Sequence, residues 1–312
     1  MKNPGLKDLG MKNNVIEVKN IFKYYGEVLA VDGVTLTVHK GETLGLIGHN
    51  GAGKSTLFKM MLGLIPPTAG EININGAAVQ GGAFRELRRS IGYLPENVVF
   101  YNNLSGLETL QFFAELKGCA LDKCLPLLEK VGLAQAATRR VDGYSKGMRQ
   151  RLGFAQALLG KPRILFLDEP TTGLDPEGIR EFYSILHELN TQGVTVVITS
   201  HILSEIQERV QRLAVMKSGK LHALGTVQEL REAVDLPLTI RIRQTCQPLE
   251  LRQALQGIAL EELTIDADTT LIRCHRSQKM EVLYRLGALG SVLEDIVVKE
   301  PSLEDVFLGY AK

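Results

Sequence analysis

Residues 48–55 limit the possible folds of this chain more than any other segment of it. Their letters, GHNGAGKS, match the spacing G-x-x-x-x-G-K-[ST] and lie between an apolar run, Thr43–Ile47, and a helical pattern that starts at Thr56. Glycines let the backbone curl so that successive N–H groups point at phosphate oxygens, and the helix N-terminus adds partial positive charge. The segment therefore predicts a phosphate-binding loop between a buried strand and a helix.

Two side chains at the end of this loop are suited to nucleotide chemistry. Lys54 can reach the terminal phosphates, and Ser55 can place its hydroxyl on Mg²⁺. The predicted binding residues of the loop are Gly48, His49, Asn50, Gly51, Ala52, Gly53, Lys54, Ser55 and Thr56.

A second apolar strand, at 164–167, leads directly into Asp168-Glu169. An Asp at the carboxyl end of such a strand matches the carboxylate that holds Mg²⁺ in enzymes with a phosphate loop. Glu169 is then placed to polarise an attacking water molecule as a general base. The pair predicts nucleotide hydrolysis at the end of this strand.

The order of the predicted elements indicates an α/β fold. Apolar strands at 43–47, 164–167 and 194–199 alternate with helical patterns and favour a parallel sheet. Further strands with period-two patterns, at 15–18, 35–38 and 71–75, predict an attached antiparallel sheet, and 213–216 with 221–224 predicts a hairpin. We expect three parts: an N-terminal extension at 1–14, a nucleotide-binding domain at 15–232, and a small α+β domain at 236–312.

The small C-terminal domain shows no catalytic cluster. Its pattern is β-α-β-β-α-β, which favours a ferredoxin-like unit. Pro301-Ser302 predicts a short closing helix, with Ser302 as N-cap and Asp305 three residues on. Dimer contact and regulation are both open as roles for this domain.

A third motif separates the kinds of enzyme that share these two parts. Residues 144–150, YSKGMRQ, precede an amphipathic helix that runs into the Asp168 strand. They resemble the signature motif of ABC transporter ATPases, usually written LSGGQ, with Ser145 and Gly147 at the positions of its phosphate contacts. The resemblance extends over almost all of residues 15–232. It implies an ABC-type fold with a RecA-like core, an antiparallel β subdomain and a helical signature subdomain.

The remaining family motifs follow in the expected order. Asp175 resembles the D-loop aspartate, His201 the switch histidine, and Tyr25 the aromatic residue that stacks on adenine. Glu96 falls where the family usually has Gln, beside the Mg²⁺ that Ser55 and Asp168 would also hold. The resemblance implies ATP and Mg²⁺ as cofactors, with Glu169, His201 and Lys54 as the catalytic residues.

Two departures from the family pattern concern the signature and Glu96. Lys146 and Met148 replace the usual Gly and Gln, while Ser145 and Gly147 are kept, so we expect activity to be retained. Glu96 keeps an oxygen for Mg²⁺ or water but adds a negative charge, which predicts altered coupling between the metal site and a membrane partner.

In this family the signature motif of one subunit faces the phosphate loop of another. Because the chain has one phosphate loop, the resemblance implies a dimer with a second copy or a paralogue, in which ATP lies between Lys54 of one protomer and Ser145 of its partner. Gly147 and Asp175 would also act in trans. No run approaches the roughly 18 apolar residues of a membrane-spanning helix, and the start of the chain has no signal-peptide core. Transport therefore requires a separate integral membrane subunit.

Several stretches look most like the NosF type of ATPase. These are 48–54, 93–98, 144–153 and 301–305. NosF-type ATPases belong to the NosDFY complex, which matures the copper sites of nitrous oxide reductase. The resemblance implies a NosY-like membrane subunit, a periplasmic NosD-like protein and a place on the cytoplasmic face of the bacterial inner membrane. The alternatives are an ATPase of a drug, bacteriocin or sodium exporter, a soluble ABC protein, and a regulatory module without turnover.

Composition excludes some partners. The net charge of +1 and an aromatic content of 6% argue against a nucleic-acid partner, which would need basic surplus or stacking side chains. The four cysteines have neither disulfide-framework nor zinc-site spacing, and no cluster of His, Cys and Met has convincing copper-ligand spacing.

Overall fold

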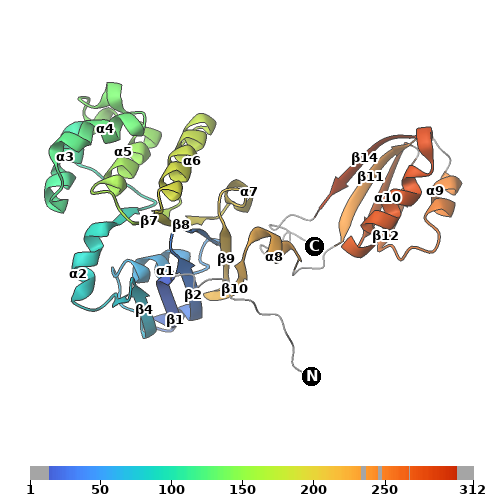
Figure 1. The fold of residues 1–312 in the computed structure, drawn as a ribbon, viewed down its shortest axis with the longest axis horizontal. Coiled ribbons are helices and arrows are strands. Elements are labelled where there is room, and N and C mark those ends of the chain that lie inside the picture. The colour runs from blue at the N-terminus through green and yellow to red at the C-terminus, as the bar shows by residue number, and fades with distance from the viewer. Residues whose placement is uncertain (1–13, 233–236, 245–247, 267, 301–312) are drawn as a thin grey trace. The chain divides into compact units, whose positions relative to one another are not determined.

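The computed structural model describes residues 14–232, 237–244, 248–266 and 268–300. The chain folds as two units, Met1–Val227 and Gln228–Lys312 (Figure 1). The predicted α/β fold is confirmed, with a second, α+β unit at the C-terminal end. Residues 1–13 lie outside the described part, and Asn14, which we expected to close the N-terminal extension, begins the first strand.

A six-stranded sheet forms the centre of the first unit, in the order β10-β9-β3-β8-β7-β6. Neighbours from β9 to β6 pair in parallel, and β10 is antiparallel to β9, as the hairpin prediction required. Every residue of β3, β7 and β8 is buried, which is typical of parallel strands with both faces covered. The strands are β3 (Thr43–Ile47), β6 (Ile91–Leu94), β7 (Ile164–Asp168), β8 (Thr195–Ser200), β9 (Arg212–Lys217) and β10 (Lys220–Gly225).

The predicted antiparallel sheet is also present, in the order β2-β1-β4-β5. Its inner residues, among them Ile16, Val18 and Ile74, belong to one hydrophobic core with Leu44, Phe58 and other residues of the central sheet and α1. Burial of this shared apolar surface holds the two sheets together as one unit. The strands are β1 (Asn14–Tyr25), β2 (Val28–His39), β4 (Ala69–Ile74) and β5 (Ala77–Ala78).

Three helices of the first unit begin at polar side-chain caps, and α1 begins at the phosphate loop. Ser105 and Glu108 form a reciprocal capping box at α3, Ser145 caps α5, and Asp175 caps α6 ahead of Pro176. The helices are α1 (Lys54–Met61), α2 (Ala83–Leu87), α3 (Gly106–Lys117), α4 (Cys124–Lys130), α5 (Lys146–Leu158), α6 (Pro176–Thr191) and α7 (Leu203–Ile206). No helix in the described residues is long and apolar enough to cross a bilayer.

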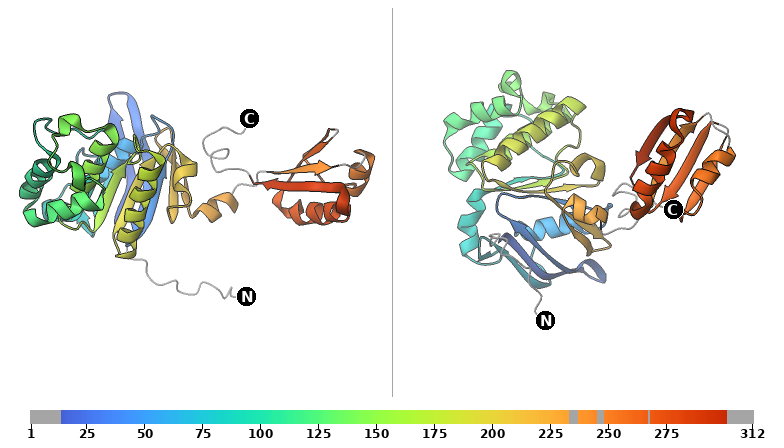
Figure 2. Two further views of the ribbon diagram at one scale, coloured as in Figure 1. Left: turned by 90° about the horizontal axis from the view of Figure 1, so that it is seen from above. Right: turned by 45° about the vertical axis from the view of Figure 1, so that its right-hand side comes forward.

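The second unit has the predicted β-α-β-β-α-β order, and its antiparallel sheet has the order β12-β13-β11-β14. Both helices lie against the same face of this sheet (Figure 2), where Ile240, Ile242 and Ile272 pack with Leu251 and Val282. The predicted closing helix at 301–305 lies outside the described residues. The elements are α8 (Val227–Glu232), β11 (Leu238–Gln244), α9 (Pro248–Ala254), β12 (Glu262–Ile265), β13 (Thr269–Cys274), α10 (Lys279–Gly287) and β14 (Leu293–Lys299).

Candidate functional site

The predicted phosphate loop connects the carboxyl end of β3 to the start of α1. Gly48, Gly51 and Gly53 all have positive φ, and at Gly53 the value is 95°. A Cβ at Gly48 would lie 2.3 Å from the carbonyl oxygen of Met216, and one at Gly53 would lie 2.5 Å from that of Ala30. Only glycine fits both the backbone conformation and the space, so this loop can curl with its N–H groups inward.

Lys54 lies buried inside the curl of this loop. Its ammonium group donates hydrogen bonds to the carbonyl oxygens of Gly48, at 2.5 Å, and His49, at 3.3 Å. Burial lowers the pKa of Lys54, and the carboxylates of Glu169, Asp168 and Glu96 oppose that shift in this order. A cation held between a glycine cradle and three carboxylates fits the phosphates of a nucleotide with a divalent cation beside them.

Asp168 is the last residue of β7 and Glu169 follows it, and one hydroxyl group from β8 organises both. Thr199 Oγ1 donates to Asp168 Oδ1 at 2.6 Å and accepts from the backbone N–H of Glu169 at 2.9 Å. Burial raises the pKa of Asp168, the hydrogen bond from Thr199 lowers it, and the charge of Glu96 raises it further. Thr199 was not predicted as a site residue, because β8 also contains the hydroxyl residues Thr195 and Ser200 and the sequence does not distinguish among the three.

Glu169 has the geometry of a positioned base. Its Oε2 lies 2.8 Å from Nδ1 of His201, its side chain is mostly buried, and the His201 ring is half exposed. Glu169 also has φ of 46°, in the left-handed region that non-glycine residues rarely adopt. The strained backbone and the histidine contact together aim this carboxylate, so two predicted site residues from β7 and the end of β8 are brought together.

Glu96 follows β6, the strand beside β7, and its charge acts on the same site. It raises the pKa of Asp168 and partly offsets the lowering of the pKa of Lys54. Burial, followed by the carboxylates of Asp168 and Glu96, raises the pKa of Tyr93 to about 12. Ser55, Asp168 and Glu96 thus supply oxygen donors around Lys54, the ligand chemistry that Mg²⁺ prefers.

A second group of predicted residues forms a separate cluster. Ser145 accepts from the N–H of Met148 at 3.2 Å, and Asp175 accepts from the N–H of Gly178 at 3.0 Å. A Cβ at Gly147 would lie 2.9 Å from the carbonyl oxygen of Gly173, so the signature segment packs against the segment before Asp175. Within the described residues, no hydrogen bond or ion pair joins this cluster to Lys54.

The two clusters are linked through Gln150, which was not predicted as a site residue. Gln150, buried in α5, donates to the carbonyl oxygen of Pro170 at 3.0 Å, one residue beyond Glu169. Tyr25 is the last residue of β1 and is half exposed, with Lys23 Nζ 5.2 Å from its ring centre. Gln150 could have been identified from the sequence, because it is the last residue of the predicted signature segment at 144–150.

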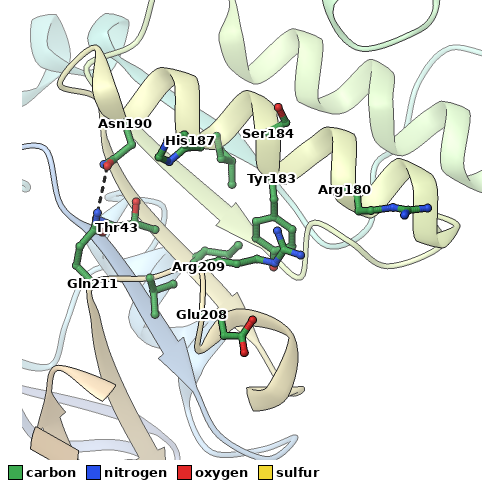
Figure 3. A pocket seen from close by; sticks show the side chains of 12 residues that line it. Thr43, Arg180, Tyr183, Ser184, His187, Asn190, Glu208, Arg209 and Gln211 are labelled. Carbon is green, nitrogen blue, oxygen red and sulfur yellow. Dashed lines mark hydrogen bonds between the residues drawn. The ribbon is translucent and has the colours of Figure 1, made fainter. Parts of the chain in front are cut away.

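A cavity of about 610 Å³ lies at the other end of β3, next to α6 (Figure 3). Thr43 begins β3, whereas the phosphate loop follows its last residue. Arg209 covers the ring of Tyr183 at 4.2 Å, and Gln211 connects Thr43 to Asn190 by hydrogen bonds. None of the predicted site residues lines this cavity, so it is distinct from the phosphate loop.

No group of three or more His, Cys, Asp or Glu side chains in the described part of the chain could hold a metal ion by itself. Cys119, Cys124 and Cys274 are free, and Cys246 lies outside the described residues.

Comparison with known proteins identifies the family. The family model described as ABC transporter matches residues 31–172. The daunorubicin resistance ATP-binding protein DrrA3 of Streptomyces coeruleorubidus is 34% identical over 96% of this chain and 96% of its own. The bacitracin transport ATP-binding protein BcrA of Bacillus licheniformis is 34% identical over 95% of this chain and 97% of its own.

Solved structures agree. A dimeric ATP-binding cassette in a post-hydrolysis state, bound to ADP and Pi, superposes with a TM-score of 0.63 at 26% identity, over 68% of this chain and 98% of its own. These similarities support the resemblance to ABC transporter ATPases. The names of these three proteins do not refer to copper or to nitrous oxide reductase. The chain therefore belongs to the family of ABC transporter ATP-binding proteins, and it is an ATPase that uses ATP with Mg²⁺.

Proposed function

We propose that this chain hydrolyses ATP at a site shared by two copies and thereby drives a separate membrane subunit. The observation that carries the proposal is the 2.8 Å contact between Glu169 Oε2 and His201 Nδ1. A carboxylate held by a histidine beside a buried lysine is what the activation of a water molecule at a phosphate requires.

Each residue of the site has a distinct role in this proposal. The loop at 48–56 and Lys54 hold the phosphates, Ser55, Asp168 and Glu96 hold Mg²⁺, and Tyr25 contacts the adenine base. When bound, ATP supplies the phosphoryl group that water attacks, and Mg²⁺ offsets its negative charge. Catalysis then depends on Glu169 and on His201 and Thr199, which position it.

Glu169 accepts a proton from the water molecule. Its Oε2 faces His201, which leaves Oε1 for this proton. The hydroxyl of Thr199 fixes the backbone N–H of Glu169 and one oxygen of Asp168, so base and metal ligand keep a constant separation. Thr199 is a positioning residue, because it acts through these two carboxylates.

The second half of the site comes from another copy. Ser145, Gly147 and Asp175 form a cluster of their own in the single chain, and we propose that this cluster faces Lys54 of the partner copy. The dimeric relative bound to ADP and Pi supports this arrangement. Closure on binding and opening after hydrolysis would then be a ligand-driven shift between two states.

The test replaces Glu169 by Gln. We expect ATP binding to be retained, ATP turnover to fall by at least about 100-fold because the base is lost, and a dimer to accumulate in the presence of ATP. Turnover is measured as phosphate release and dimerisation by light scattering. The matched control is Glu129→Gln on the exposed side of α4, which should change neither. Unchanged turnover in Glu169→Gln would refute the role of this residue.

An exposed apolar patch near Glu96 supports a protein partner on this side of the chain. Val99 is 85% exposed, Tyr101 62% and Leu116 70%, and the rings of Tyr101 and Phe112 lie 5.9 Å apart, edge to face. Patches of this kind are typical of interaction sites. We propose that the membrane subunit contacts this patch. Because Val99 lies three residues after Glu96 in the chain, movement of the membrane subunit would then be transmitted to the metal site.

For the transported cargo, we propose a NosF-type role at the cytoplasmic face of the bacterial inner membrane. The stretches at 48–54, 93–98 and 144–153 support this assignment by their resemblance to NosF-type ATPases. The partners would be a NosY-like membrane subunit and a periplasmic NosD-like protein. The chain itself would supply work, while metal or sulfur species are handled elsewhere.

A second candidate function is the ATPase of an exporter of antibiotics or other drugs. It is supported by DrrA3 and BcrA, whose names refer to daunorubicin resistance and bacitracin transport and whose similarity covers nearly the whole chain.

Deletion of the gene in its native bacterium separates the two candidates. Under the NosF-type proposal, nitrous oxide reductase is still made but lacks its catalytic copper–sulfur centre, and antibiotic tolerance is unchanged. Under the exporter proposal, the reductase is fully loaded and the strain becomes more sensitive to a particular drug. Copper content and absorption spectra of the purified reductase are the measurement, with the Glu169→Gln gene returned as the control for ATPase activity.

A further inference from the structure

The sheet of the C-terminal unit has one face that no helix in the described residues covers. Helices α9 and α10 pack on the other face, over Ile240, Ile242 and Ile272 (Figure 2). Since strand side chains alternate between faces, Thr239, Arg241 and Arg243 of β11 point the opposite way. We name this second surface the open face.

The strand register shows which residues share the open face. Arg241 lies opposite Leu271 and Val297, and Arg243 lies opposite Thr269 and Asp295. In the last row of the face, Thr239 lies opposite Arg273 and Lys299, and Glu262 lies opposite Arg273. The face thus combines four cations with two carboxylates and a small apolar centre.

The positive charge of the open face is only partly compensated. Arg273 forms an ion pair with Glu262 at 3.5 Å. Arg241 and Arg243 are exposed, and neither forms a hydrogen bond or ion pair with any part of the chain that the structure describes. Pairing of this face with the same face of another copy would bring like charges together, which is unfavourable. The face therefore suits an acidic partner with apolar side chains.

A segment with this chemistry follows directly in the chain. Residues 301–312 read PSLEDVFLGYAK and include Glu304 and Asp305 among Leu303, Val306, Phe307 and Leu308. Their placement is outside the described residues. Glu300 is held by Lys279 of α10 at 2.9 Å, which fixes the point from which the segment leaves β14.

The length of this segment matches the open face. Lys299 and Arg243 lie two rows apart in the register, about 13 Å along the strands. The twelve residues after Glu300 are more than long enough to span this distance, whether they are extended or helical. We propose that residues 301–312 cover the open face of their own chain, with Glu304 and Asp305 near Arg241 and Arg243 and the apolar residues over Leu271 and Val297.

Charge reversal tests this proposal in the full-length protein. Cleavage by chymotrypsin at Phe307 reports how often the segment leaves the face, and each rate is divided by that of a free peptide of the same sequence. We expect R241E/R243E to raise this relative rate about five-fold, E304R/D305R to raise it similarly, and the combined variant to return it close to wild type, because the charges again match.

The matched control is R252E, which reverses an exposed arginine on α9, on the covered side of the sheet, and should leave the relative rate unchanged. ATP turnover of every variant checks that the first unit is intact. The proposal is overturned if neither reversal changes the relative rate, or if the combined variant stays as labile as the single reversals. Protection that disappears on dilution would also overturn it, since the segment would then lie on another copy. The result is independent of what the ATPase drives.

Discussion

At the scale of single residues, the site is defined by the carboxylates of Glu169, Asp168 and Glu96, whose charges all act on the buried Lys54. Asp168 and Glu96 both act on Lys54, and Glu96 also acts on Asp168. Burial alone would favour the neutral forms of Lys54 and Asp168, and their mutual attraction opposes this. Glu96, where the family usually has Gln, adds attraction for Lys54 but repulsion for Asp168. The charge of this one residue therefore tunes the metal ligand.

Glu96→Gln should shift the acidic limb of the pH profile of ATP turnover to lower pH. Glu96 raises the pKa of Asp168, so its removal lets Asp168 stay ionised, and able to bind Mg²⁺, in more acidic solution. The measurement is kcat against pH at saturating Mg²⁺ and ATP. Glu115→Gln, on the exposed side of α3, is the control and should leave the profile in place. A shift to higher pH would contradict this account of Glu96.

At the scale of elements, the termini of helices position the site and the signature cluster. Ser145 and Asp175 cap α5 and α6, and Ser105 with Glu108 caps α3. Hydrogen bonds from the backbone and side chain of Ser105 lower the pKa of Glu108. The contribution of Glu108 is therefore present at neutral pH and is lost as pH falls through this lowered pKa.

Ser105→Ala should destabilise the first unit by about 1 kcal/mol at pH 7, because the N–H of Glu108 loses its acceptor and Ser105 is nearly buried. Urea denaturation followed by circular dichroism measures the change. Ser184→Ala, on the exposed side of α6, is the comparison and should be neutral or slightly stabilising, since Ala favours helix interiors. Equal stability of Ser105→Ala and wild type would show that the cap contributes nothing.

At the scale of the whole molecule, the composite site makes a prediction about mixtures. Lys54→Ala and Ser145→Ala should each be inactive as pure proteins. Mixing them creates dimers in which one of two sites joins an intact Lys54 to an intact Ser145, so activity should rise to at most about a quarter of wild type. Phosphate release from 1:1 mixtures is the measurement. Activity equal to the sum of the pure variants would exclude a site shared between copies.

Much of this site could be predicted from sequence because its parts are local. Residues 48–56 and Asp168-Glu169 each lie in a short run whose strand and helix can be recognised from neighbouring residues. Strand β6 was not predicted as a strand, because its four residues include Gly92. A Cβ there would lie 2.1 Å from the carbonyl oxygen of Ala157 in α5, a requirement of packing that the local pattern does not show.

The sequence by itself determined the phosphate loop, the ATPase family and the β-α-β-β-α-β order of the second unit, since these depend on contiguous residues and on the order of elements. Only the tertiary structure decided which distant residues meet. Thr199 joins Asp168 and Glu169 because β8 pairs with β7, and Glu96 acts on Asp168 because β6 pairs with β7. Neighbouring strands in a parallel sheet are separated in sequence by whole crossovers, so these contacts arise from strand pairing and burial rather than from any local pattern.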